Sequence, residues 1–118
     1  MRRHGAMATE GLQQTLLDPT RFSIVSLLAA TDWAEFGFVR DTVGLSDSAL
    51  SKQVATLANL EFVEVVKGYV GKRPRTWIRL STTGRSALGR HITALQHIAA
   101  TAAEHGIAHR VERGPATA

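Results

Sequence analysis

The fold of this chain is indicated by the run Lys67-Gly68-Tyr69-Val70-Gly71-Lys72-Arg73-Pro74-Arg75-Thr76-Trp77-Ile78-Arg79-Leu80. The run predicts a β-hairpin, because residues 63–67 and 76–80 alternate apolar and polar side chains around a centre rich in glycine and proline. The predicted tip is basic: seven of the chain's fourteen Lys and Arg residues, and no Asp or Glu, lie between positions 67 and 90. Three of these cations surround Pro74, namely Lys72, Arg73 and Arg75.

A short helix is predicted just before the hairpin, over residues 46–58, and another before it, over 38–43. Ser46 is a favourable N-cap for the later helix. Gly44 is well suited to end the earlier helix in the left-handed conformation. Two helices joined by such a tight turn make a helix-turn-helix.

The helix over 46–58 has one apolar and one polar face. Its apolar residues recur at helical spacing and are expected in the core: Leu50, Val54 and Leu57. The polar face and its flanks carry short or flexible side chains: Ser46, Ser48, Ser51, Lys52 and Gln53. Such a face fits a DNA major groove, and the cationic tip fits the phosphate backbone, so both sets are candidate DNA-binding residues. The alternative is a solvated helix face beside cations that protect a sheet edge.

The other segments complete one small domain of 118 residues. A short helix is expected over residues 10–17. Asp18 and Pro19 start a second helix that runs to about residue 30, and a short strand is expected at 34–36. Ser81 caps a long final helix, which is expected to stop at Gly106. The predicted boundaries are a flexible tail at 1–9, the domain at 10–105 and a second flexible tail at 106–118. The fold class is α+β, mainly helical.

Composition narrows the functional classes. The net charge of +4 favours an anionic partner, and residues 31–66 carry six acids against two bases, so the positive field belongs to one surface. The chain has no cysteine, which excludes disulfides and thiolate metal sites. No apolar run approaches the length of a membrane span, and the start is not a secretory signal. We therefore expect a cytoplasmic protein.

The final helix has an apolar stripe that exceeds the needs of so small a core. Together with leucines near the N-terminus, the stripe predicts a two-fold dimer interface through Leu12, Leu16, Leu88, Ile92, Leu95 and Ile98. The alternative is that the stripe only closes the core of one monomer.

The sequence offers no catalytic site and no cofactor site. It has no nucleophile with a base, no phosphate-binding glycine loop and no paired carboxylates, so we expect no enzyme activity. His105 and His109 are four residues apart, a metal-ligand spacing, but Gly106 interrupts the helix between them. We assign no metal ligands and expect the late histidines on a helix surface.

The motifs resemble a known family. Leu45-Ser46-x-Ser48-x-Leu50-Ser51-Lys52-x-Val54-x-x-Leu57, followed by Gly68-Tyr69-Val70-Gly71-Lys72-Arg73-Pro74-Arg75-Thr76 and Leu80-Ser81-x-x-Gly84-Arg85, is similar to the small MarR-like winged-helix DNA-binding regulators. The similarity covers about residues 12–100. The chain has Thr82-Thr83 where family members usually have a proline and an acid.

The resemblance implies a winged helix-turn-helix with terminal dimerisation helices. It also implies a homodimeric bacterial transcription factor, often a repressor, that binds an inverted repeat in double-stranded DNA. The residues of 46–58 would lie on the recognition helix, and the cations of 67–80 on the wing. Two other functions remain open: a metal- or ligand-responsive sensor that uses the late histidines, and a winged helix that binds only proteins. A small-molecule effector is a possible further partner.

Overall fold

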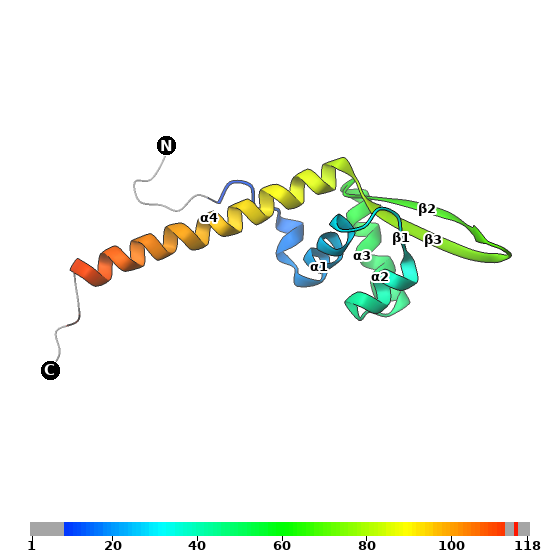
Figure 1. Cartoon of the computed structure of the whole chain (residues 1–118), viewed down its shortest axis with the longest axis horizontal. Helices are drawn as coiled ribbons and strands as arrows, with labels where there is room; N and C mark the ends of the chain where they lie inside the picture. The colour runs from blue at the N-terminus through cyan, green and yellow to red at the C-terminus, as the bar shows by residue number, and fades with distance from the viewer. Residues whose placement is uncertain (1–8, 113–114, 116–118) are drawn as a thin grey trace.

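The computed structural model describes residues 9–112 and 115. In chain order its elements are the 3-10 helix η1 (Gln14–Leu17), α1 (Pro19–Ala29), β1 (Ala34–Glu35), α2 (Phe36–Val43), α3 (Asp47–Asn59), β2 (Val63–Val70), β3 (Arg73–Leu80) and α4 (Thr82–Glu112). The β2–β3 hairpin projects from one side of the helical body, and α4 runs out on the other side (Figure 1). The predicted class, mainly helical α+β with a helix-turn-helix before a wing, is confirmed.

The strands form one antiparallel sheet in the order β1-β3-β2. Val63 pairs with Leu80 and Val70 with Arg73, so the hairpin is longer than its sequence predicts and closes at Gly71–Lys72. Gly71 adopts φ 64°, a left-handed value that favours glycine. Pro74 lies inside β3 rather than in the turn, beyond the end of β1, where the strand has a neighbour on one side only.

The core lies between the helices and the base of the sheet. Its fully buried side chains come from every layer: Leu16, Ile24, Val25, Leu28, Val39, Leu50, Leu57 and Ile78. The helix starts that bound these layers are capped as predicted. The Asp18 side chain accepts a hydrogen bond from the Arg21 N–H at 3.0 Å. The Ser81 hydroxyl accepts one from the Gly84 N–H at 2.9 Å.

Gly84 sets how closely α4 approaches Phe62, in the turn between α3 and β2. An added Cβ at this position would collide with the carbonyl oxygen of Phe62 and would lie 2.7 Å from Leu80 Cδ1. The same junction is held by the Ser81 N–H, which donates to the Phe62 carbonyl at 2.9 Å. Only glycine fits here, and this contact fixes the root of the wing against α4.

Two sequence predictions about the chain ends are wrong. Residues 10–17 do not form one helix, because Gly11 turns with φ 95° and only Gln14–Leu17 is helical. Helix α4 does not stop at Gly106 but continues to Glu112, so the tail predicted for 106–118 is helical over its first part. One glycine lowers the stability of a helix by only about 1 kcal/mol. The flanking alanines favour the helix, so α4 continues through this position. The tail predicted for 1–9 lies almost entirely outside the described residues.

Candidate nucleic-acid interface

The turn between α2 and α3 is built as the sequence predicts. Gly44 ends α2 with φ 78°, and the N–H groups of Gly44 and Leu45 donate to the Arg40 carbonyl at 2.9 and 3.0 Å. Ser46 caps α3, its hydroxyl accepting the Ala49 N–H at 3.2 Å. The start of α3 is therefore fixed relative to α2 by backbone and cap together.

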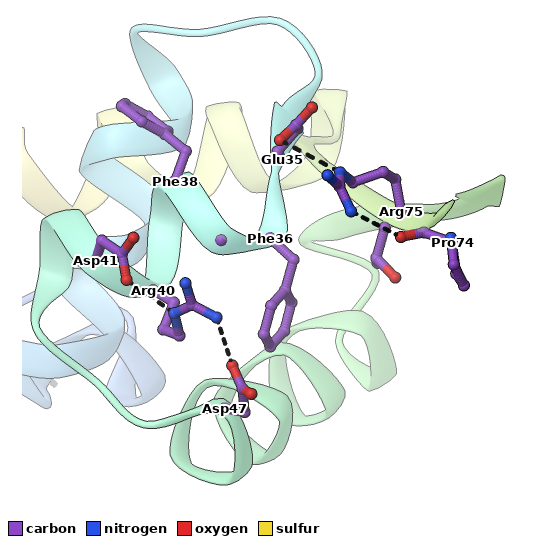
Figure 2. A pocket seen from close by; sticks show the side chains of 10 residues that line it. Glu35, Phe36, Phe38, Arg40, Asp41, Asp47, Pro74 and Arg75 are labelled. Carbon is purple, nitrogen blue, oxygen red and sulfur yellow. Dashed lines mark hydrogen bonds and ion pairs between the residues drawn. The ribbon is translucent and has the colours of Figure 1, made fainter. Parts of the chain in front are cut away.

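Arg40 adds a side-chain link across the same turn (Figure 2). Its Nε and Nη1 donate to Asp41 and Asp47, each at 2.8 Å. The hydrogen bond from Arg40 holds the pKa of Asp41 below its usual range, and both carboxylates raise the pKa of Arg40. Since Asp47 is the first residue of α3, Arg40 holds the start of α3 to α2. No sequence prediction gave Arg40 this role.

Helix α3 presents the predicted two faces. Leu50, Val54 and Leu57 are buried, and Ser48, Ser51 and Lys52 are exposed on the other side. Gln53 differs from the other candidates because it is half-buried and its side-chain carbonyl accepts from Arg21 Nη1 at 3.2 Å. Arg21 Nε also donates to the Thr15 carbonyl at 2.9 Å, so Gln53 takes part in a structural bridge.

The pleat of the wing divides its residues between two faces. The side chains of Lys67 and Tyr69 alternate with Gly68 and Val70, and cross-strand pairs share a face. Lys67 and Tyr69 therefore lie with Thr76 and Pro74 on the side of the sheet that packs on α3. The outer side carries a row of residues from β3: Arg73, Arg75, Trp77 and Arg79.

A groove runs between α3 and this inner side of the wing. We call it the helix–wing groove; its volume is about 400 Å³ and its lining residues are Phe36, Ser51, Val54, Ala55, Ala58, Val65, Lys67 and Thr76. Val65 lines this groove from β2 and is 39% exposed. Lys67 was not among the predicted DNA-binding residues, although strand alternation from Val63 could have assigned it to this face.

The wing cations differ in what surrounds them. On the outer face Arg79 pairs with Glu64 at 3.1 Å, and Arg75 lies 3.9 Å from Glu35. None of the ion pairs found among residues 9–112 involves Lys52, Lys67, Lys72 or Arg73. Two sequence-predicted wing cations, Lys72 and Arg73, are thus exposed at the tip without such a pair in that range, whereas Arg75 has a carboxylate beside it.

A second hollow, of about 590 Å³, lies between α2, the start of α3 and β3 (Figure 2). Its charged walls contain three carboxylates and two guanidiniums: Glu35, Asp41, Asp47, Arg40 and Arg75. The opposite charges are already paired with one another at 2.8 to 3.9 Å. The hollow therefore links the ion pairs of the turn to those of the wing.

The predicted dimerisation residues divide into core and surface. Leu16 and Leu88 are buried inside the monomer, so they are core residues and have no surface to offer a second chain. Leu12, Ile92 and Ile98 are half-buried, and Leu95 is 40% exposed. Further along α4, Ile107 is 53% exposed. An apolar surface along α4 remains uncovered in the monomer.

His91 corrects the expectation of surface histidines on the last helix. It is buried, its Nδ1 accepts the Gln13 N–H at 3.0 Å, and its ring lies 5.7 Å from that of Phe22.

His105 and His109 are exposed one turn apart on a continuous helix. Within the part of the chain that the structure describes, no three His, Cys, Asp or Glu side chains gather as a metal site. No helix of that part is long and apolar enough to cross a membrane.

Comparisons with known proteins agree with this geometry. A family model described as a winged helix DNA-binding domain matches residues 20–99. An uncharacterized protein of Methanocaldococcus jannaschii is 29% identical over 72 residues, which cover 61% of this chain and 78% of that protein.

Solved structures share the fold. A transcriptional regulator homologue from Pyrococcus horikoshii has a TM-score of 0.69 at 22% identity, over 75% of this chain and 87% of its own. The M. tuberculosis transcriptional regulator MOSR, solved in complex with DNA, has a TM-score of 0.61 at 17% identity, over 92% and 72%. ZitR of Lactococcus lactis, a zinc-responsive MarR family member, has a TM-score of 0.56 at 19% identity, over 89% and 72%.

Proposed function

We propose, from the premise that this chain belongs to the winged helix DNA-binding domain family, that it is a sequence-specific, dimeric regulator of transcription. The observation that carries the proposal is the union of an exposed polar face on α3 with an exposed cationic wing across the helix–wing groove. Helix α3 would enter the major groove, and the wing would hold the flanking backbone. The protein would act in the cytoplasm, where bacterial DNA lies.

Each part of the surface has its own task in this proposal. Ser48, Ser51 and Lys52 are exposed on α3 and can reach base edges or phosphates. Lys67 lines the groove where the DNA backbone would pass from helix to wing. Lys72 and Arg73 at the tip would contact phosphates and so raise the affinity for DNA of any sequence. Ser46 has its hydroxyl occupied by the α3 cap, so its contribution would be to set the start of the helix.

We propose that two copies associate through the uncovered apolar surface of α4 and the N-terminal segment. The support is the exposure of Leu95 and Ile107 on a helix that runs well beyond the core. A two-fold dimer would set its recognition helices roughly 34 Å apart, one turn of DNA, and would favour an inverted repeat. Repression would follow when the bound dimer blocks polymerase. Release would need a ligand or partner that changes the spacing between the helices.

The first experiment separates the residues that set overall DNA affinity from those that set sequence specificity. Arg73→Ala with Arg75→Ala should weaken binding to every duplex, because the wing contacts phosphates. Lys52→Ala should change sequence preference more than overall affinity. Arg110→Ala, an exposed residue in the last turn of α4, is the charge control and should leave affinity unchanged. An unaltered affinity in the double variant would exclude the wing from the interface.

The second experiment tests the dimer. Leu95→Asp introduces a charge into the apolar surface of α4 and should shift the protein to monomer in sedimentation, with weaker binding to an inverted repeat. Gln96→Asp, an exposed neighbour on the same helix, should stay dimeric. A wild-type protein that sediments as a monomer at micromolar concentration would contradict the dimer.

A further inference from the structure

The outer face of the wing holds two arginines in different ways. Arg79 is fixed from two sides: Glu64 accepts from its Nη2 at 3.1 Å, and its guanidinium lies 4.5 Å from the centroid of the Trp33 ring. Asp32 adds a third, longer contact at 3.9 Å. Arg79 is therefore a structural side chain of the sheet.

Arg75 is held loosely by comparison. Its contact with Glu35 is a 3.9 Å ion pair rather than a hydrogen bond, and within residues 9–112 the hydrogen bond found for its guanidinium goes to the carbonyl of the preceding Pro74, at 3.1 Å. The residue paired with it on β2 is Gly68, which has no side chain to pack against it. An arginine in this setting can turn toward a new anion at little cost.

Glu35 faces Arg75 because of its position in the chain (Figure 2). It ends β1 and sits at the N-cap of α2, yet its side chain makes no capping hydrogen bond. The carboxylate points instead across the sheet to the guanidinium of Arg75 and borders the hollow between α2 and the wing. Among the residues described, Glu35 is the carboxylate paired with a predicted DNA-binding cation of the wing.

We propose that Glu35 tunes DNA affinity by competing with a DNA phosphate for Arg75. This inference rests on the proposed function. In the free protein Glu35 holds Arg75, and on binding Arg75 exchanges the carboxylate for a phosphate oxygen, which releases Glu35 to solvent. Glu35 is thus a positioning residue that lowers affinity for all duplexes and acts only through Arg75.

The test is a double-mutant cycle on DNA affinity, measured by fluorescence anisotropy with one duplex selected by the wild-type protein. Glu35→Gln should raise affinity about two- to fivefold at low salt, as the loss of an exposed ion pair allows. The slope of the logarithm of affinity against the logarithm of salt concentration should stay close to that of the wild type, because Arg75 neutralises one phosphate in both complexes. The gain in DNA affinity should vanish in the Arg75→Gln background, because the cation for which Glu35 and the phosphate compete is then absent.

Glu64→Gln is the matched control. Glu64 also pairs with an arginine of β3, on the same face, and its side chain is 47% exposed against 49% for Glu35. The Glu64→Gln substitution removes the same charge as Glu35→Gln, so its effect on DNA affinity measures the change in net charge alone. This effect should be smaller than that of Glu35→Gln, and it should be the same in the Arg75→Gln background. Equal gains from the two variants, or a Glu35→Gln gain that persists without Arg75, would overturn this inference and leave the proposed function standing. A wild-type protein that binds no duplex would overturn both.

Discussion

Gly84→Ala should destabilise the protein, although alanine is the better helix former. The added Cβ would collide with the Phe62 carbonyl oxygen, a backbone atom that cannot rotate away, and would meet Leu80 Cδ1 at 2.7 Å. To relieve the collision, the start of α4 must move away from Phe62, in the turn between α3 and β2. That movement strains the hydrogen bonds that Ser81 makes to the carbonyls of Phe62 and Glu61, at 2.9 and 2.5 Å.

The magnitude follows from two opposing terms. Overpacking of a close contact costs up to about 3 kcal/mol, and replacing a helical glycine by alanine returns about 1 kcal/mol. The net loss in unfolding free energy is about 2 kcal/mol, which for a chain of this size lowers Tm by roughly 8 °C. Gly89→Ala is the matched control, because nothing lies within 4 Å of its added Cβ. It should gain up to about 1 kcal/mol.

Thermal unfolding followed by circular dichroism checks both values. All variants must be compared at one protein concentration, because dimer formation would make Tm depend on it. A Gly84→Ala variant as stable as wild type, or stabilised as much as Gly89→Ala, would refute the reasoning that α4 is pinned to Phe62.

Three further outcomes follow from the geometry of the turn, the groove and the N-terminal segment. Gly44→Ala should cost about 1–2 kcal/mol in urea unfolding, through its φ of 78° alone, because no atom crowds its Cβ. Lys67→Ala should weaken binding to all duplexes and reduce the salt slope by about one for each phosphate that the lysine neutralises; an unchanged slope would remove Lys67 from the interface. His91→Leu should cost about 1–3 kcal/mol, since the Gln13 N–H loses its acceptor. His97→Leu, on the exposed side of α4, should cost little, and equal losses at the two sites would contradict the role given to His91.

The helix starts and the turn could be predicted because their signals are local. Asp18, Ser46 and Ser81 cap helices in the structure as their side chains predict, and Gly44 adopts the left-handed conformation expected of it. These outcomes depend on a few neighbouring residues and on backbone sterics, so one sequence suffices to predict them.

The features that the sequence did not predict depend on contacts between segments far apart in the chain. His91 is buried because the N-terminal segment packs on α4 and offers it the Gln13 N–H, a partner 78 residues away. Gln53 is engaged by Arg21 of α1, and Arg75 by Glu35 of β1. Neither pairing has a local signal. The division of wing residues between two faces could be predicted from the sequence, because it follows from strand alternation once the two-residue turn at Gly71–Lys72 is known.

The proposed function requires that α3 and the wing hold duplex DNA, largely through phosphate contacts. The decisive measurement is the affinity of the purified protein, between about 50 and 200 mM salt, for a duplex that it selects from genomic fragments. With the exposed cations of two subunits engaged, affinity should fall by about a thousandfold or more across that range. An affinity that does not change with salt, or the failure to select any duplex, would contradict DNA binding through phosphate contacts.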